Sequence, residues 1–151
     1  MEPQETDEQQ PQEPVVAIYS KWAILLFSIF FSPFVGAILL MLNLRSVGRK
    51  REGTGILLLA IVYQLLSRVI LSIVFKDIPI GTTPQELLSN TRFFAYSLIP
   101  DILGGGLLSE YFFKKHFPDD RNYEYKSILG PLLIVLLLSI PLGLLYMSFK
   151  V

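Results

Sequence analysis

Residues 53–75 read GTGILLLAIVYQLLSRVILSIVF, and this stretch decides the fold class. It is slightly longer than the roughly 20 residues that a helix needs to cross the hydrocarbon layer of a bilayer. Three more apolar stretches of similar length lie at residues 22–44, 93–113 and 128–149. Because lipid cannot satisfy backbone polar groups, a helix is the form we expect for all four. The sequence therefore predicts an all-α integral membrane protein, an antiparallel four-transmembrane-helix bundle.

The composition agrees with this class and excludes several others. Hydrophobic residues make up 52% of the 151 residues and charged residues only 17%, against roughly a quarter in ordinary soluble domains. The formal net charge is zero, so the chain is not a generally basic nucleic-acid binder. It has no cysteine, and its single histidine, His116, lies beside two lysines in a polar connection, where a solvated side chain is expected. We expect neither a metal site nor a cofactor.

The first 14 residues differ sharply from the rest. The segment MEPQETDEQQPQEP contains five carboxylates, three prolines and no basic residue. Such a segment cannot bury enough apolar surface to offset the entropy lost on ordering. We predict a disordered acidic tail over residues 1–14 and a single membrane domain over residues 15–151.

The connections between the apolar stretches predict the orientation. Residues 45–52 and 114–127 together carry eight basic residues, whereas the flanks on the opposite side carry four. Short cytoplasmic loops are enriched in Lys and Arg. Both loops are therefore expected in the cytoplasm, with the N- and C-termini outside and the chain in the cell inner membrane.

Arg68 is the most costly residue to place in a membrane, at about 2.5–3.5 kcal/mol for a mid-helix arginine on insertion scales. Gln64 lies four residues before it and Ser67 lies alongside, so the three form one polar stripe on the helix. A matching stripe on residues 93–113 contains Ser97 and Asp101.

Arg68 and Asp101 are expected at the same depth. Each lies about 12–13 Å below the same boundary, taking a rise of roughly 1.5 Å per residue. The sequence thus predicts an intramembrane pair between them. Three interpretations stay open: the pair locks two helices together, it forms a polar site or transport pathway, or Arg68 snorkels while Asp101 is neutral.

Small residues mark the faces on which helices are expected to pack. They let backbones approach closely and so promote helix association in lipid. Pro100 precedes Asp101 and the three glycines that follow, and such backbone can kink, unwind or pack closely. The predicted packing residues are Ser28, Ser32, Gly36, Gly104, Gly105, Gly106, Ser139 and Gly143.

Motifs of soluble enzymes are missing from the sequence. It contains no G-x-S-x-G, no H-E-x-x-H, no P-loop and no G-x-G-x-x-G. The apolar stretches contain no histidine and no plausible nucleophile–base pair. We therefore expect no catalytic residue and no enzyme.

The run SPFVGAILLMLNLRSVGRKREG contains Pro33, Gly36, Asn43, Arg45 and a Gly48-Arg49 turn. It resembles a pattern in many small, uncharacterised bacterial polytopic membrane proteins, in which a Pro/Gly-containing helix ends in Asn-x-Arg. The resemblance covers the first third of the chain. It implies a bacterial inner membrane and no particular activity.

Two functions are consistent with the sequence. The first is a non-catalytic multi-pass membrane protein that acts through helix packing, either with itself as a homo-oligomer or within a larger membrane complex. The second is a small transporter or channel that uses Asp101 and Arg68. In both, the lipid bilayer is the immediate partner and nucleic acid is not.

Overall fold

The computed structural model describes residues 16–74, 91–119 and 122–148, and these are mostly helical. The elements are β1 (Ala17–Ile18), α1 (Lys21–Phe30), α2 (Pro33–Ser46), α3 (Lys50–Val74), α5 (Thr91–Gly106), the π-helical η1 (Leu107–Phe113), α6 (Lys114–His116), β2 (Glu124–Tyr125) and α7 (Leu129–Ser148). The helices expected at 53–75, 93–113 and 128–149 correspond closely to α3, to α5 with η1, and to α7. The predicted tail, residues 1–14, lies outside the described residues.

The expectation of one continuous helix over residues 22–44 is wrong. The chain forms α1, breaks at Phe31 and Ser32, and begins α2 at Pro33. Proline disfavours helical geometry in the residue before it and suits the first position of a new helix. Ser32 is accordingly extended, with φ 169° and ψ 160°.

α1 and α2 run antiparallel and form a helical hairpin. The start of α1 lies beside the end of α2, because the Asn43 side chain accepts from Tyr19 N at 2.7 Å and donates to Tyr19 O at 2.8 Å. Nearer the turn, Gly36 of α2 faces Ile24 and Ser28 of α1. The first apolar stretch therefore folds back on itself, and its two ends lie at the same end of the molecule.

The turn between α2 and α3 and the pair of strands also lie at that end, which we call the basic end. α2 turns into α3 through Gly48, whose φ of +78° lies in the left-handed region that favours glycine. β1 pairs in parallel with β2, in the register Ala17↔Glu124 and Ile18↔Tyr125. Lys126 also donates its backbone N–H to Ile18 O at 2.8 Å. This contradicts the expectation that residue 22 and residues 45–52 lie at opposite ends.

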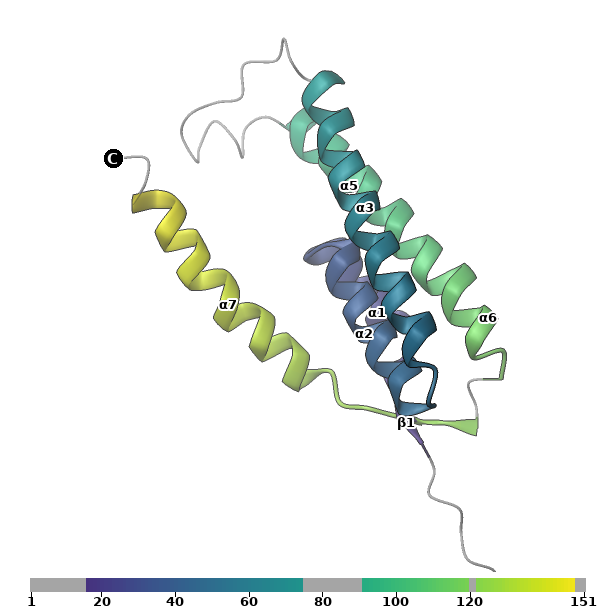
Figure 1. Cartoon of the computed structure of the whole chain (residues 1–151). Helices are drawn as coiled ribbons and strands as arrows, with labels where there is room; N and C mark the ends of the chain where they lie inside the picture. The colour runs from purple at the N-terminus through teal and green to yellow at the C-terminus, as the bar shows by residue number, and fades with distance from the viewer. Residues whose placement is uncertain (1–15, 75–90, 120–121, 149–151) are drawn as a thin grey trace, which may run out of the picture.

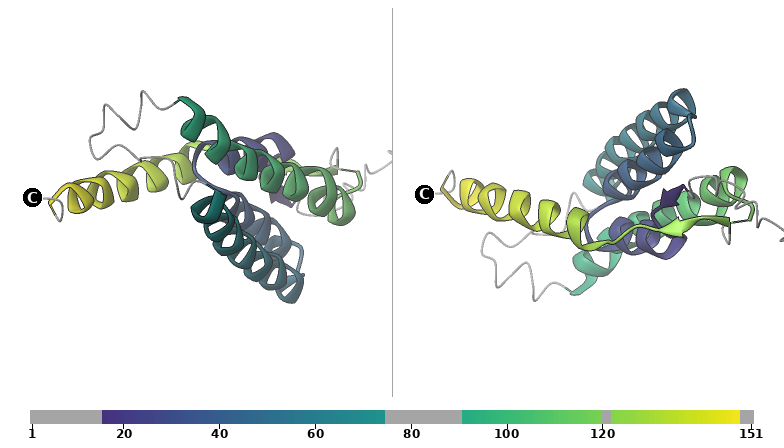
Figure 2. Two further views of the ribbon diagram at one scale, coloured as in Figure 1. Left: turned by 90° about the horizontal axis from the view of Figure 1, so that it is seen from above. Right: turned by 90° about the horizontal axis from the view of Figure 1, so that it is seen from below.

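From the basic end, some helices run side by side and one runs apart. α3 lies along α2, and α1 lies along α5 and η1, whereas α7 leaves the others and projects away (Figures 1 and 2). A continuous helical run of 23 residues, Thr91–Phe113, makes up α5 and η1.

The buried core occupies the basic half of the molecule. It forms where the hairpin meets η1, α6 and the first half of α3, and its fully buried members include Ile24, Leu40, Leu44, Phe113 and Phe117. The buried residues of α3 are Gly53, Ile56 and Ala60, all in its first half. Beyond Ala60 the helix presents apolar side chains to its surroundings, Leu65, Val69 and Ile73 among them.

Among the described residues, one helix is long and apolar enough to cross a membrane by length and composition, and it is α3. Shorter apolar helices are Lys21–Phe30, Pro33–Ser46 and Leu129–Leu138.

Candidate functional site

The hairpin is closed by a contact between two small residues. Ser28 is fully buried and its hydroxyl donates to Ile24 O at 2.7 Å. A Cβ placed on Gly36 would collide with this hydroxyl and lie 2.9 Å from the Ile24 carbonyl oxygen. The two backbones can come this close because Gly36 has no side chain.

The glycines of α5 receive the hairpin. A Cβ on Gly104 would lie 2.6 Å from Pro33 Cγ and 2.8 Å from a Tyr63 ring carbon. A Cβ on Gly105 would lie 2.8 Å from Ser28 Cβ. Gly104 and Gly105 are therefore the positions at which α5 packs against the turn of the hairpin. Pro33 lies between α3 and α5.

The remaining predicted packing residues are placed differently. Gly106 has no atom within 4 Å of the position that a Cβ would take. Ser32 is half-buried at the break between α1 and α2 and makes no capping hydrogen bond through its side chain. Ser139 and Gly143 lie on α7, and what they contact falls outside the part of the chain that the structure describes.

Tyr63 is a site residue that the sequence did not reveal. Its hydroxyl donates to the Pro100 carbonyl at 2.7 Å and so ties α3 to α5 at the level of the hairpin turn. Pro100 lies inside α5 and has no N–H to donate to the preceding turn. A single tyrosine in an apolar stretch does not indicate which residue its hydroxyl will contact.

The polar stripe of α3 lies just beyond this contact. With its amide oxygen facing Arg68, Gln64 accepts from Nε and Nη2 of Arg68 at 3.3 Å each. Ser67 instead donates to Tyr63 O of its own helix at 2.8 Å. Gln64 and Arg68 thus satisfy each other along one helix face, as their four-residue spacing predicts.

Asp101 lies on α5, half-buried, with Arg68 as the cation that acts on it electrostatically. No ion pair within 4.0 Å joins the two among the described residues. The expected direct contact is therefore not made, and Arg68 acts on Asp101 through its charge alone. Ser97 shares α5 with Asp101, but its side chain is outside the described set.

A second polar cluster lies at the basic end. The Glu52 carboxylate is 2.9 Å from Nδ1 of His116, and Arg49 Nη1 is 3.2 Å from the same nitrogen. The tautomer sets which of these contacts is a hydrogen bond, because Nδ1–H donates to Glu52 whereas an unprotonated Nδ1 accepts from Arg49. The His116 side chain is only 8% exposed, so the expected solvated histidine is corrected. Burial lowers the pKa of His116, and the Glu52 carboxylate partly opposes this shift.

Glu110 joins the start of α1 to the end of η1. Its carboxylate pairs with Lys21 at 2.9 Å and with Lys114 on the next turn. Within the described residues, no group of three or more His, Cys, Asp or Glu side chains is arranged to hold a metal ion. The ion pairs at the basic end therefore connect α1, α3, η1 and α6.

Comparison of the chain with protein-family models, with curated proteins and with solved structures finds no match.

Proposed function

We propose that the chain is a non-catalytic multi-pass protein of a bacterial inner membrane that acts by helix packing, with itself or within a larger membrane assembly. The observation that carries this proposal is the outward apolar surface of α3. Its buried residues form one stripe at Gly53, Ile56 and Ala60, and exposed apolar side chains cover most of the helix between Leu58 and Val74 apart from the polar stripe at Gln64 and Arg68. Such a surface suits lipid or another apolar helix.

Because residues 22–44 fold into a hairpin, we do not assign a membrane crossing to them. α1 is about 15 Å long and α2 about 21 Å at 1.5 Å per residue, both shorter than a hydrocarbon core of roughly 30 Å. α3, the α5–η1 run and α7 have enough residues to cross. We therefore favour three crossings and a re-entrant hairpin over four crossings.

The depth of the hairpin supports this assignment. Its turn meets α3 at Tyr63, ten residues after Gly53, where α3 first becomes buried. Ten residues rise about 15 Å, which is half of the hydrocarbon core. Irregular backbone at this depth is tolerated where protein surrounds it, and Pro33 is buried against Gly104 and Tyr63.

The basic end supplies the orientation. It carries an excess of basic residues that short cytoplasmic segments share: Lys21, Arg45, Arg49, Lys50, Arg51, Lys114, Lys115 and Lys126. Residues 16–20 then face the cytoplasm together with residues 45–52 and 114–127, and the C-terminus lies outside.

The orientation is tested by labelling single cysteines in this cysteine-free chain. Val16→Cys, Ser46→Cys, Asp119→Cys and Thr82→Cys are treated with an impermeant thiol reagent on intact cells. We expect labelling of Thr82→Cys alone, with the other three labelled after the membrane is opened. Four crossings would instead label Val16→Cys together with Thr82→Cys, so position 16 decides between the topologies.

The packing role is tested by the mass of the purified particle. In mild detergent, light scattering should give a protein mass that is a multiple of 17.1 kDa or that includes a second protein. A protein mass of one chain, with nothing co-purifying, would contradict the proposal.

A small transporter or channel remains the second candidate, and one observation favours it. Gln64, Arg68 and Asp101 lie beyond the turn of the hairpin, in the half of the membrane that a re-entrant hairpin leaves unfilled. Polar residues at such a depth commonly border a substrate pathway. Asp101→Cys should react with an impermeant reagent from outside if water reaches this region, and should be inert if the region is dry.

A further inference from the structure

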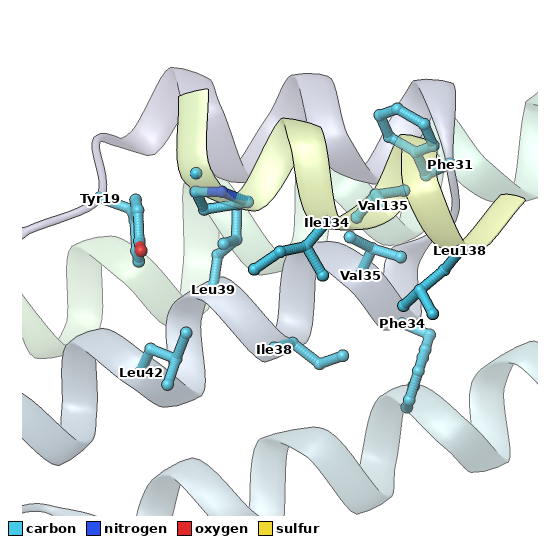
Figure 3. Close-up of a pocket in the computed structure, with 12 residues that line it drawn as sticks. Tyr19, Phe31, Phe34, Val35, Ile38, Leu39, Leu42, Ile134, Val135 and Leu138 are labelled. Atoms are coloured by element: carbon cyan, nitrogen blue, oxygen red, sulfur yellow. The ribbon is translucent and has the colours of Figure 1, made fainter. Parts of the chain in front are cut away.

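A groove separates the hairpin from α7. Its walls are apolar and come from α2 on one side and the first half of α7 on the other, with Tyr19 at one end (Figure 3). Its volume is about 640 Å³. The side chains that line it include Phe34, Ile38 and Leu42 of α2 and Ile134, Val135 and Leu138 of α7.

The groove runs along much of one leaflet. On α2 its lining extends from Phe34 to Leu42, eight residues further along the helix, and on α7 from Gly130 to Leu138. At 1.5 Å per residue this is about 12 Å, against half of a hydrocarbon core of roughly 30 Å. One acyl chain in the cytoplasmic leaflet can therefore lie along it.

A hydrocarbon chain suits this groove because apolar side chains line it along its length. A second apolar helix would meet the same walls, so the charge at the mouth of the groove decides between the two occupants.

The end of the groove at Tyr19 is cationic. Lys126 Nζ lies 5.5 Å from the Tyr19 ring centroid and donates to Ser46 Oγ at 3.0 Å. Arg45, adjacent to Ser46, is exposed. Glu124 forms no ion pair with Lys126 among the described residues. Within the described part of the chain, no carboxylate therefore neutralises Lys126 at the mouth of the apolar groove.

We propose that this groove binds an anionic glycerophospholipid, with one acyl chain between α2 and α7 and the phosphate group at Lys126. The proposal rests on the membrane location argued above. The apolar walls select a hydrocarbon chain, and the lysine at the mouth selects a negative headgroup. The lipid would then fill the space between α7 and the hairpin.

The test measures lipid retention by the full-length chain in detergent, using native mass spectrometry. Phosphatidylglycerol and phosphatidylcholine with identical acyl chains are offered separately. We expect phosphatidylglycerol to be retained about fivefold more, the equivalent of roughly 1 kcal/mol for one lysine near an anionic surface. Lys126→Gln should bring the two lipids to parity. Lys115→Gln, a basic residue at the same end that does not line the groove, should leave the preference unchanged.

Occupation of the groove is tested by filling it. Ile134→Trp places a large side chain in the groove, whereas Leu137→Trp is a matched change on a part of α7 that does not line it. Ile134→Trp should abolish retention of both lipids while Leu137→Trp retains them. Circular dichroism and the melting temperature of each variant report whether it is folded.

Three outcomes would overturn the proposal. They are equal retention of the two lipids by the unaltered chain, retention by Ile134→Trp, and a drop in oligomer mass in Ile134→Trp with lipid retention intact. The last would make the groove an interface between copies. Failure of the membrane proposal gives a different result, because the chain would then be recovered in the soluble fraction without detergent.

Discussion

At the scale of single residues, two adjacent glycines have opposite roles. Gly105 faces Ser28, and a Cβ there would come within 2.8 Å of the serine Cβ, whereas Gly106 faces open space. Gly105→Ala should lower the free energy of unfolding by about 1–3 kcal/mol through overpacking. Gly106→Ala should be neutral or stabilise by up to about 1 kcal/mol, since alanine favours helices. Unfolding in mixed micelles measures both changes. Equal effects on the free energy of unfolding would contradict the close packing of Gly105 against Ser28.

Arg68 and Asp101 give the second prediction at this scale. Their charges act on each other without direct contact, and Arg68 already binds Gln64. In a double-mutant cycle with Arg68→Leu and Asp101→Leu, the double variant should lose less stability than the sum of the singles. We expect a coupling of at least about 0.5 kcal/mol, the lower limit for residues that share an interaction. Strictly additive losses would show that the two residues act independently.

At the scale of elements, Asn43 holds the start of α1 against the end of α2. Its buried amide satisfies both the N–H and the C=O of Tyr19. Asn43→Ala removes the partner of both half-buried groups, at a cost of about 1–3 kcal/mol in total. Thr54→Ala removes an exposed hydrogen bond to Lys50 O and should cost under about 0.5 kcal/mol. Comparable losses in thermal unfolding would argue against this role for Asn43.

His116 links α6 to the beginning of α3 and gives a pH prediction. Its pKa in the folded chain is below its usual value, so the unfolded chain binds the proton more tightly. Its contribution to stability is therefore full above the unfolded pKa of about 6.5 and is lost as pH falls from there through the lower pKa of the folded chain. The groups that face His116 are Glu52, Arg49 and Lys115.

The measurement is the melting temperature between pH 7.5 and 5.5. The unaltered chain should lose stability over this interval, and His116→Asn should lose less, because asparagine takes up no proton there. A steeper decline in His116→Asn than in the unaltered chain would show that His116 binds its proton more tightly when folded.

At the scale of the whole molecule, packing is concentrated in the basic half. Leu40 of α2 is fully buried, whereas Leu137 of α7 is 67% exposed. Leu40→Ala should cost about 2–5 kcal/mol, the range for leucines buried in a core. Leu137→Ala should change stability by under about 0.5 kcal/mol. A large loss from Leu137→Ala would show that α7 is packed against more than the described contacts.

Length and hydropathy were sufficient to predict the helices of three of the four apolar stretches. The apolar stretches at 53–75, 93–113 and 128–149 are helical because their composition and length favour a structure that satisfies its own backbone. The four-residue step from Gln64 to Arg68 predicted one polar stripe, since a helix brings such residues onto one face, and the two side chains contact each other there. These features are local, and local sequence determines them.

The tertiary structure decided where the first stretch turns and what the small residues contact. A Ser-Pro pair can bend a continuous helix or end one, and residues 22–44 are equally apolar in both cases. Contacts between distant parts settle the choice, because Asn43 bonds to Tyr19 and Pro33 packs against Gly104. The burial of His116 beside Glu52 depends in the same way on residues 64 positions apart. The periodicity of a sequence predicts which residues share one face of a helix. Which helices pack together depends on the fit of side chains that are distant in the sequence, and this fit exists only in the folded chain.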